Sequence, residues 1–106
     1  MLTPTDIAEY GERHVERWLG ENNFQCYHSQ QRHAGATDLE ARNPEMNLLV
    51  RVKAALAPQN ATELSDGERH GICSRAMMLE CDAWFAQVQI DVHGQLMGEI
   101  KWTKLN

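Results

Sequence analysis

Apolar residues near the start of the chain recur at the spacing of one helical face. They are Ile7, Ala8, Gly11, Val15, Trp18 and Leu19. Thr3 can cap such a helix and Pro4 suits its first turn, whereas Gly20 and Asn22 end it. The pattern predicts a helix that packs one side against a sheet. Glu12 lies at the edge of the apolar stripe, so we expect its carboxylate to be half buried against that sheet.

Three short segments with strand-like composition follow this helix. Residues 24–29 predict a first strand, and residues 37–42 and 48–54 predict two more. Asn43-Pro44 begins the connection between the last two, and this dipeptide is a strong turn signal. The sequence therefore predicts a hairpin near the middle of the chain.

Alternation of side chains places the charged residues of this hairpin on one face of each strand. Asp38 and Glu40 share a face, and Arg51 and Lys53 point away from the aliphatic residues of their strand. If the strands pair with their charged faces aligned, the four residues gather in one patch. An acidic pair beside a lysine is what a metal-dependent phosphodiesterase needs, because carboxylates hold Mg²⁺ and the lysine positions or polarises the attacking water.

A second helix is predicted from a capping box formed by Ser65 and Glu68. It begins near Asp66, and its apolar side comprises Ile72, Cys73, Ala76 and Leu79. We interpret the run of residues 77–79, Met-Met-Leu, as core packing.

Two further strands complete the chain. Residues 83–92 predict a strand with an apolar face of alternate residues and a second face that carries Gln87, Gln89 and Asp91, and residues 96–103 predict the partner strand; the apolar face comprises Trp84, Ala86, Val88, Ile90 and Val92. His93-Gly94 is interpreted as a two-residue hairpin turn between them. In the last strand the residues expected to face the core are Leu96, Gly98, Ile100 and Trp102. The predicted order is α-β-β-β-α-β-β in one domain that spans residues 1–106.

Composition and charge limit the function classes. A chain of 106 residues is one domain. It contains no apolar run near the roughly 20 residues of a membrane span and no signal-peptide pattern at its start, so we expect a cytoplasmic protein. The net charge of −5 is the wrong sign for general nucleic-acid binding and favours a weak or metal-dependent contact. The three cysteines indicate free thiols, and neither zinc-ligand spacing nor a phosphate-loop motif is found.

Two motifs carry a resemblance to a known superfamily. Residues 35–41, Gly-Ala-Thr-Asp-Leu-Glu-Ala, resemble the Gly-x-x-Asp stretch of archaeal Holliday-junction resolvases, and residues 50–53, Val-Arg-Val-Lys, resemble their second half-motif. The chain thus resembles the PD-(D/E)xK nuclease superfamily, which includes restriction endonucleases. The resemblance implies an α/β, restriction-endonuclease-like fold with a mixed central sheet flanked by helices. It also implies DNA as substrate or ligand, Mg²⁺ or Mn²⁺ as cofactor if the site is active, and allows a homodimer.

The resemblance assigns roles to further residues. Gly11-Glu12, with the packing residues that follow, resembles the first helix of resolvase-like proteins, in which the Glu approaches the metal. It makes Glu12 a metal ligand beside Asp38 and Glu40, and Lys53 the catalytic lysine; the alternative for Glu12 is a solvated helix acid. The candidate phosphate contacts are Arg32, Arg69 and Arg75, with solvated surface positions as the alternative.

Arg51 departs from the superfamily, because the residue two before the lysine is normally an acid or amide that binds metal. A cation there changes the site by two charge units, and one charge pair at about 4 Å and an effective dielectric near 20 is worth about 4 kcal/mol. Two hypotheses follow. Either Glu40 supplies the missing carboxylate while Arg51 binds phosphate, or Arg51 and Lys53 pair with Asp38, Glu40 and Glu12 in a salt-bridge cluster. The first gives a metal-dependent nuclease, and the second an inactive nuclease-like binding or interaction domain.

Overall fold

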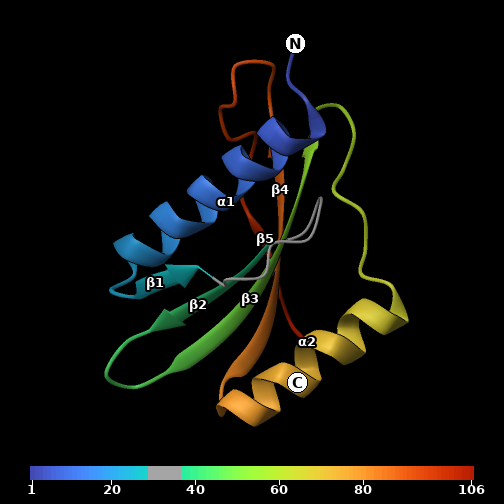
Figure 1. The fold of residues 1–106 in the computed structure, drawn as a ribbon. Helices are drawn as coiled ribbons and strands as arrows, with labels where there is room; N and C mark the ends of the chain where they lie inside the picture. Colours follow the sequence, from blue (N-terminus) through green and yellow to red (C-terminus); the bar gives the residue numbers. More distant parts are fainter. Residues whose placement is uncertain (29–36) are drawn as a thin grey trace.

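The computed structural model describes the backbone of residues 1–28 and 37–106, and the side chains of residues 1–27 and 39–106. Within these residues, two helices and five strands occur in the predicted order (Figure 1). They are α1 Pro4–Glu21, β1 Gln25–His28, β2 Thr37–Arg42, β3 Asn47–Leu56, α2 Asp66–Leu79, β4 Asp82–Ile90 and β5 Lys101–Lys104.

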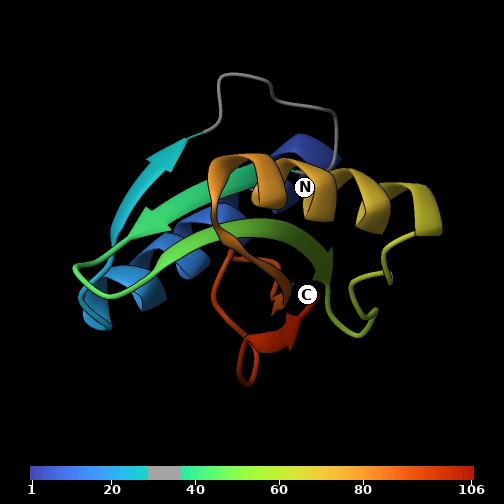
Figure 2. The same cartoon turned by 90° about the horizontal axis from the view of Figure 1, so that it is seen from below.

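The strands form one mixed sheet in the order β1-β2-β3-β4-β5. β1 pairs antiparallel with β2, β2 antiparallel with β3, β3 parallel with β4, and β4 antiparallel with β5. β2 and β3 run side by side as a curved hairpin (Figure 2). α2 lies in the crossover between the parallel strands β3 and β4, because a parallel pair cannot be joined by a tight turn.

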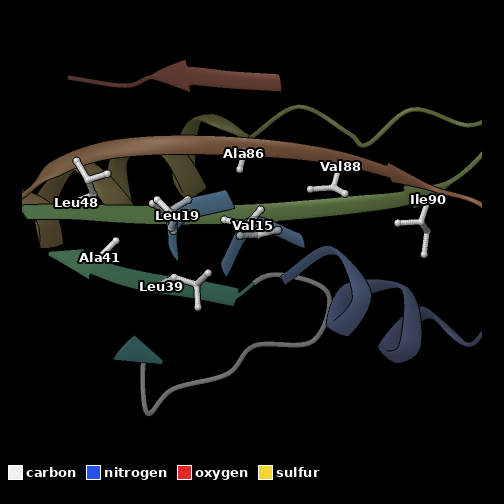
Figure 3. Packing of buried hydrophobic residues seen from close by; sticks show 10 residues of the cluster. Val15, Leu19, Leu39, Ala41, Leu48, Ala86, Val88 and Ile90 are labelled. Atoms are coloured by element: carbon white, nitrogen blue, oxygen red, sulfur yellow. The ribbon is translucent and has the colours of Figure 1, made fainter. Parts of the chain in front are cut away.

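Each helix covers one face of this sheet. Val15 and Leu19 of α1 form a hydrophobic cluster with side chains of β2, β3 and β4, most of which are labelled in Figure 3; these are Leu39, Ala41, Leu48, Val50, Val52, Ala86, Val88 and Ile90. On the other face, Ile72 and Ala76 of α2 pack against Leu49, Ala83 and Phe85, together with Cys81 and Leu105. The alternation predicted for β3, and for β4 as far as Ile90, is therefore confirmed, and the residues of β3 between its α1-facing positions lie on the side of α2. Val92, predicted on the same face, follows the end of β4 and is 65% exposed.

The helix starts and the central turn also agree with the sequence. The Thr3 hydroxyl accepts from the backbone N–H of Asp6 at 3.1 Å, and the Ser65 hydroxyl accepts from that of Glu68 at 3.2 Å. In the turn between β2 and β3, Asn43 Oδ1 accepts from the backbone N–H of Glu45 and of Met46. This local bonding closes the turn and so fixes the register of the hairpin.

The prediction that residues 77–79 belong to the core is wrong. Met77 and Met78 are 79% and 84% exposed, and Leu79 is 45% exposed. α2 touches the sheet through Ile72 and Ala76, and the next two residues are rotated by about 100° and 200° from that contact line. Hydrophobic character alone did not show that the helix ends here.

The last predicted strand is also shorter than expected. It begins at Lys101 rather than residue 96, and Leu96 makes only an isolated bridge with Ile90. Gly98 has a φ of +69°, which interrupts the extended backbone, and Leu96 is 36% exposed instead of buried. The preceding turn is closed by the Gly94 N–H, which donates to Asp91 O at 3.0 Å, so the pair at its centre is residues 92–93.

Three other observations complete the fold. Cys26, Cys73 and Cys81 are free thiols, as predicted. No helix in the described part of the chain is both long enough and apolar enough to span a membrane. β5 is the outer strand beside β4 and is flanked by a tryptophan cluster, in which Trp102 lies 4.8 Å from Trp18 and 6.4 Å from Trp84 between ring centroids.

Gly11 is the point of closest approach between α1 and β3, and this gives a stability prediction. A Cβ added at Gly11 would lie 2.5 Å from the Ala54 Cβ, whereas one at Gly20 would meet no atom within 4 Å. Gly11→Ala should destabilise the fold by about 1–3 kcal/mol through overpacking, despite a helix-propensity gain of about 1 kcal/mol. Gly20→Ala has only the propensity gain. Urea unfolding measures both, and a Gly11→Ala protein at least as stable as Gly20→Ala would contradict the close packing.

Candidate functional site

Two cations of β3 meet one carboxylate of α2. Arg51 and Lys53 lie two positions apart, so both point toward α2, and their side chains are only 9% and 15% exposed. Arg51 Nη1 lies 3.5 Å from Glu68 Oε2, and Lys53 Nζ lies 3.0 Å from Glu68 Oε1. We refer to these three residues as the Arg51–Lys53–Glu68 cluster.

Glu68 is held in this position by the cap of its own helix. Its Oε1 accepts from the Ser65 backbone N–H at 3.0 Å, so the oxygen that pairs with Lys53 also closes the capping box. The Ser65 hydrogen bond and, next, the bond from Lys53 lower the pKa of Glu68 from 4.5 to about 2. The carboxylate is therefore fully ionised at neutral pH.

Lys53 also holds the connector between β3 and α2. Its Nζ lies 3.4 Å from Glu63 O and 3.5 Å from Thr62 Oγ1, longer contacts than the one to Glu68. The adjacent Gln87 donates from Nε2 to Ala61 O at 3.1 Å and to Thr62 O at 3.3 Å. The lysine expected to serve a reacting water is thus engaged in fixing a loop and a helix start.

Burial and charge act in opposite directions on Arg51. Burial lowers the pKa of its guanidinium, and the negative charge of Glu68 raises it. An arginine stays protonated in proteins, so the cluster carries two positive charges and one negative charge. This net positive charge belongs to the three residues of the cluster alone, and the acids Asp38 and Glu63 are their neighbours in the β2–β3 pair and in the connector.

The predicted patch is assembled only in part. Arg51 and Lys53 come together as expected, but their carboxylate partner is Glu68 rather than Glu40. Glu40 lies opposite Leu49 and forms an ion pair with Arg42 at 3.1 Å. Asp38 lies opposite Arg51 in the β2–β3 register, and the position of its side chain is outside the description.

Glu12 lies on the helix that covers the other face of the sheet from α2. It is 5% exposed, so it is more deeply buried than the half-buried position that we expected, and the interpretation as a solvated acid is wrong. Arg69 and Arg75 are exposed on α2, as expected, and Arg69 Nη2 lies 3.5 Å from Leu105 O. Arg32 lies outside the described residues.

The donors described around Lys53 do not fit a Mg²⁺ site as they stand. Mg²⁺ prefers near-octahedral oxygen ligands, usually with one or two carboxylates. Beside Lys53 the described side chains offer one carboxylate, Glu68, and two cations share it. No group of three His, Cys, Asp or Glu residues that could hold a metal ion occurs among the described side chains. We therefore derive no catalytic step through a metal.

Comparison with known proteins was made by sequence and by structure. No protein-family model matches the sequence, and no curated protein matches it. Among solved structures, the chain is similar to Hjc, a Holliday junction resolvase from the archaeal hyperthermophile Archaeoglobus fulgidus. The TM-score is 0.67 at 17% sequence identity, over 92% of this chain and 72% of that one. The chain has a restriction-endonuclease-like fold.

The structural similarity confirms the fold that the resemblance implied, a mixed sheet with flanking helices. Within it, Glu68 is the residue that the sequence analysis did not assign to the site. The signal was present, because the capping box places Glu68 in the first turn of the crossover helix that returns over β3. The sequence does not show the angle at which α2 crosses β3, and this angle decides whether Glu68 reaches Arg51 and Lys53.

The lowered pKa of Glu68 predicts a pH dependence of stability. Because the pKa is about 2 in the folded protein and 4.5 as the ordinary value, Glu68 stabilises the fold fully above pH 4.5. This contribution falls as the pH drops from 4.5 toward 2. The Glu68→Gln variant lacks this stabilising carboxylate. The difference in free energy of unfolding between wild type and variant should therefore shrink as the pH falls from 4.5 toward 2. Urea unfolding at successive pH values measures it, and a constant difference would contradict the assignment.

Proposed function

We propose that this chain is a cytoplasmic, nuclease-fold domain that binds nucleic-acid phosphate through Arg51 and Lys53 and does not hydrolyse it. One observation carries the proposal. Two cations occupy the strand positions where the superfamily motif has acid-x-Lys, and among the described side chains both contact the carboxylate of Glu68. This arrangement suits a phosphate group better than it suits a divalent cation.

Electrostatics supports the absence of hydrolysis. A Mg²⁺ ion near Asp38 would lie close to the guanidinium of the residue opposite, Arg51. One unit charge pair at about 4 Å and an effective dielectric near 20 is worth about 4 kcal/mol, and the ion carries two charges. Lys53, in turn, is held by Glu68 at 3.0 Å. A metal would have to overcome repulsion by Arg51, and Lys53 would have to leave Glu68, before catalysis could occur.

The fold supports nucleic acid as the ligand, because the similar solved structure is named as a Holliday junction resolvase. Exposed Arg69 and Arg75 lie on the same helix as Glu68 and would serve as further phosphate contacts. The net charge of −5 opposes general attraction to DNA. Binding should therefore be weak, local to these cations and sensitive to salt.

A second candidate function is metal-dependent hydrolysis of DNA, with Asp38, Glu12 and Glu40 as ligands and Lys53 as the catalytic lysine. One observation favours it: Glu12 is a carboxylate that is 5% exposed. A buried acid is a frequent feature of functional sites. In this candidate, Arg51 would contact the scissile phosphate.

Binding and cleavage of labelled DNA separate the two candidates. In EDTA and low salt, wild type should bind both a four-way junction and a linear duplex, and Mg²⁺ should produce no cleavage. Lys53→Met should reduce the salt dependence of log K by about one unit, since one phosphate contact contributes a slope of about 0.9. Lys101→Met, an exposed lysine on β5, is the control. Binding that requires Mg²⁺, or cut DNA, would contradict the proposal. Light scattering of the same samples measures whether a homodimer forms.

Calorimetric titration with Mg²⁺ and Mn²⁺ tests the metal directly. We expect no binding to wild type at millimolar metal, and a gain of binding in Arg51→Glu, because that change restores the acid-x-Lys pattern and reverses one charge. Arg51→Gln is the neutral variant for comparison, since Arg51 is buried and a charge reversal can impair folding. Metal binding by wild type that is lost in Asp38→Ala would favour the second candidate.

A further inference from the structure

Glu68 makes the contacts that a bound phosphate would make. Its two oxygens are divided between the two cations, Oε2 at 3.5 Å from Arg51 and Oε1 at 3.0 Å from Lys53. A phosphodiester group has two charged oxygens that bridge neighbouring cations in the same way. The space between Arg51 and Lys53 is thus a site for an anion that already contains one.

The three members of the anion site are buried to different extents. The exposed fractions of the side chains are 9% for Arg51, 15% for Lys53 and 31% for Glu68. The carboxylate is the most exposed member, and the cations lie deeper. Solvent therefore has more access to Glu68 than to either cation.

We infer that Glu68 is an autoinhibitory residue, which occupies the phosphate site of this domain and lowers its affinity for nucleic acid. The inference rests on the proposed function. Only molecules in which Glu68 has left the cations can bind phosphate there, so the apparent dissociation constant rises as that fraction falls. The acid is in the first turn of α2, and its cap to Ser65 limits how often it leaves.

Glu68→Gln tests this inference with little disturbance of the fold. A glutamine keeps the side-chain oxygen that accepts from Ser65 and is itself a common capping-box residue. It loses the charge that pairs with the cations. Asp66→Asn is the matched control, because Asp66 is an exposed acid in the same first turn and its loss changes the net charge by the same amount.

The measurement is fluorescence anisotropy with a labelled linear duplex at low salt. Glu68→Gln should bind about tenfold more tightly than Asp66→Asn, which corresponds to the loss of one charged competitor. The gain should disappear in the double variant Glu68→Gln/Lys53→Met, because the freed cation is then absent. Glu68→Ala, which also loses the cap, should change affinity in the same direction as Glu68→Gln.

The outcomes separate this inference from the proposed function. If Glu68→Gln and Asp66→Asn bind alike while wild-type binding still depends on Lys53, Glu68 does not inhibit and the proposed function stands. If wild type and every variant fail to bind the duplex, the proposed function fails and the inference fails with it. A gain that persists in the double variant would also overturn the inference, since it would come from another site.

Discussion

β3 has to satisfy two different neighbours along its whole length, and the rest of the structure depends on how it does so. Toward α1 it presents Leu48, Val50 and Val52, which are almost completely buried. Toward α2 it presents Leu49 and then two cations, Arg51 and Lys53. Burying a charge is costly unless it is paired, so the apolar contact of α2 cannot continue along this face. Glu68, in the first turn of α2, supplies the negative charge that pairs with both cations.

The balance of the cluster explains why the same fold can support different chemistry. With an acid in place of Arg51, the cluster would hold two carboxylates, at positions 51 and 68, and one lysine, and a metal would be favoured. With arginine there, the carboxylate of Glu68 serves to neutralise the site. The packing of α1 on the sheet does not involve position 51, because that side chain points toward α2 and away from the α1 core. Fold similarity at 17% identity therefore carries no statement about activity.

The features that could be predicted from the sequence are those set by local periodicity. Alternation in β3 and β4 gave the correct faces, and Asn43 closed the turn that places Asp38 opposite Arg51. The features that could not be predicted depend on distant contacts. The partner of Lys53 is 15 residues away along the chain, and the exposure of Met77 and Met78 follows from the point at which α2 leaves the sheet. The late start of β5 follows from the left-handed backbone at Gly98, which an alternating pattern does not reveal.

Glu68 links the stability of a helix end to the state of the anion site. One oxygen, Oε1, receives the N–H of Ser65 and the ammonium of Lys53 at 3.0 Å each. A ligand that takes Lys53 removes one of these bonds and leaves the cap, so the helix start need not unfold when the site is filled. Removal of the cap as well would loosen the connector that Lys53 and Gln87 hold. A ligand that takes Lys53 therefore competes with Glu68 for this cation, and the Ser65 bond holds Glu68 in place against it.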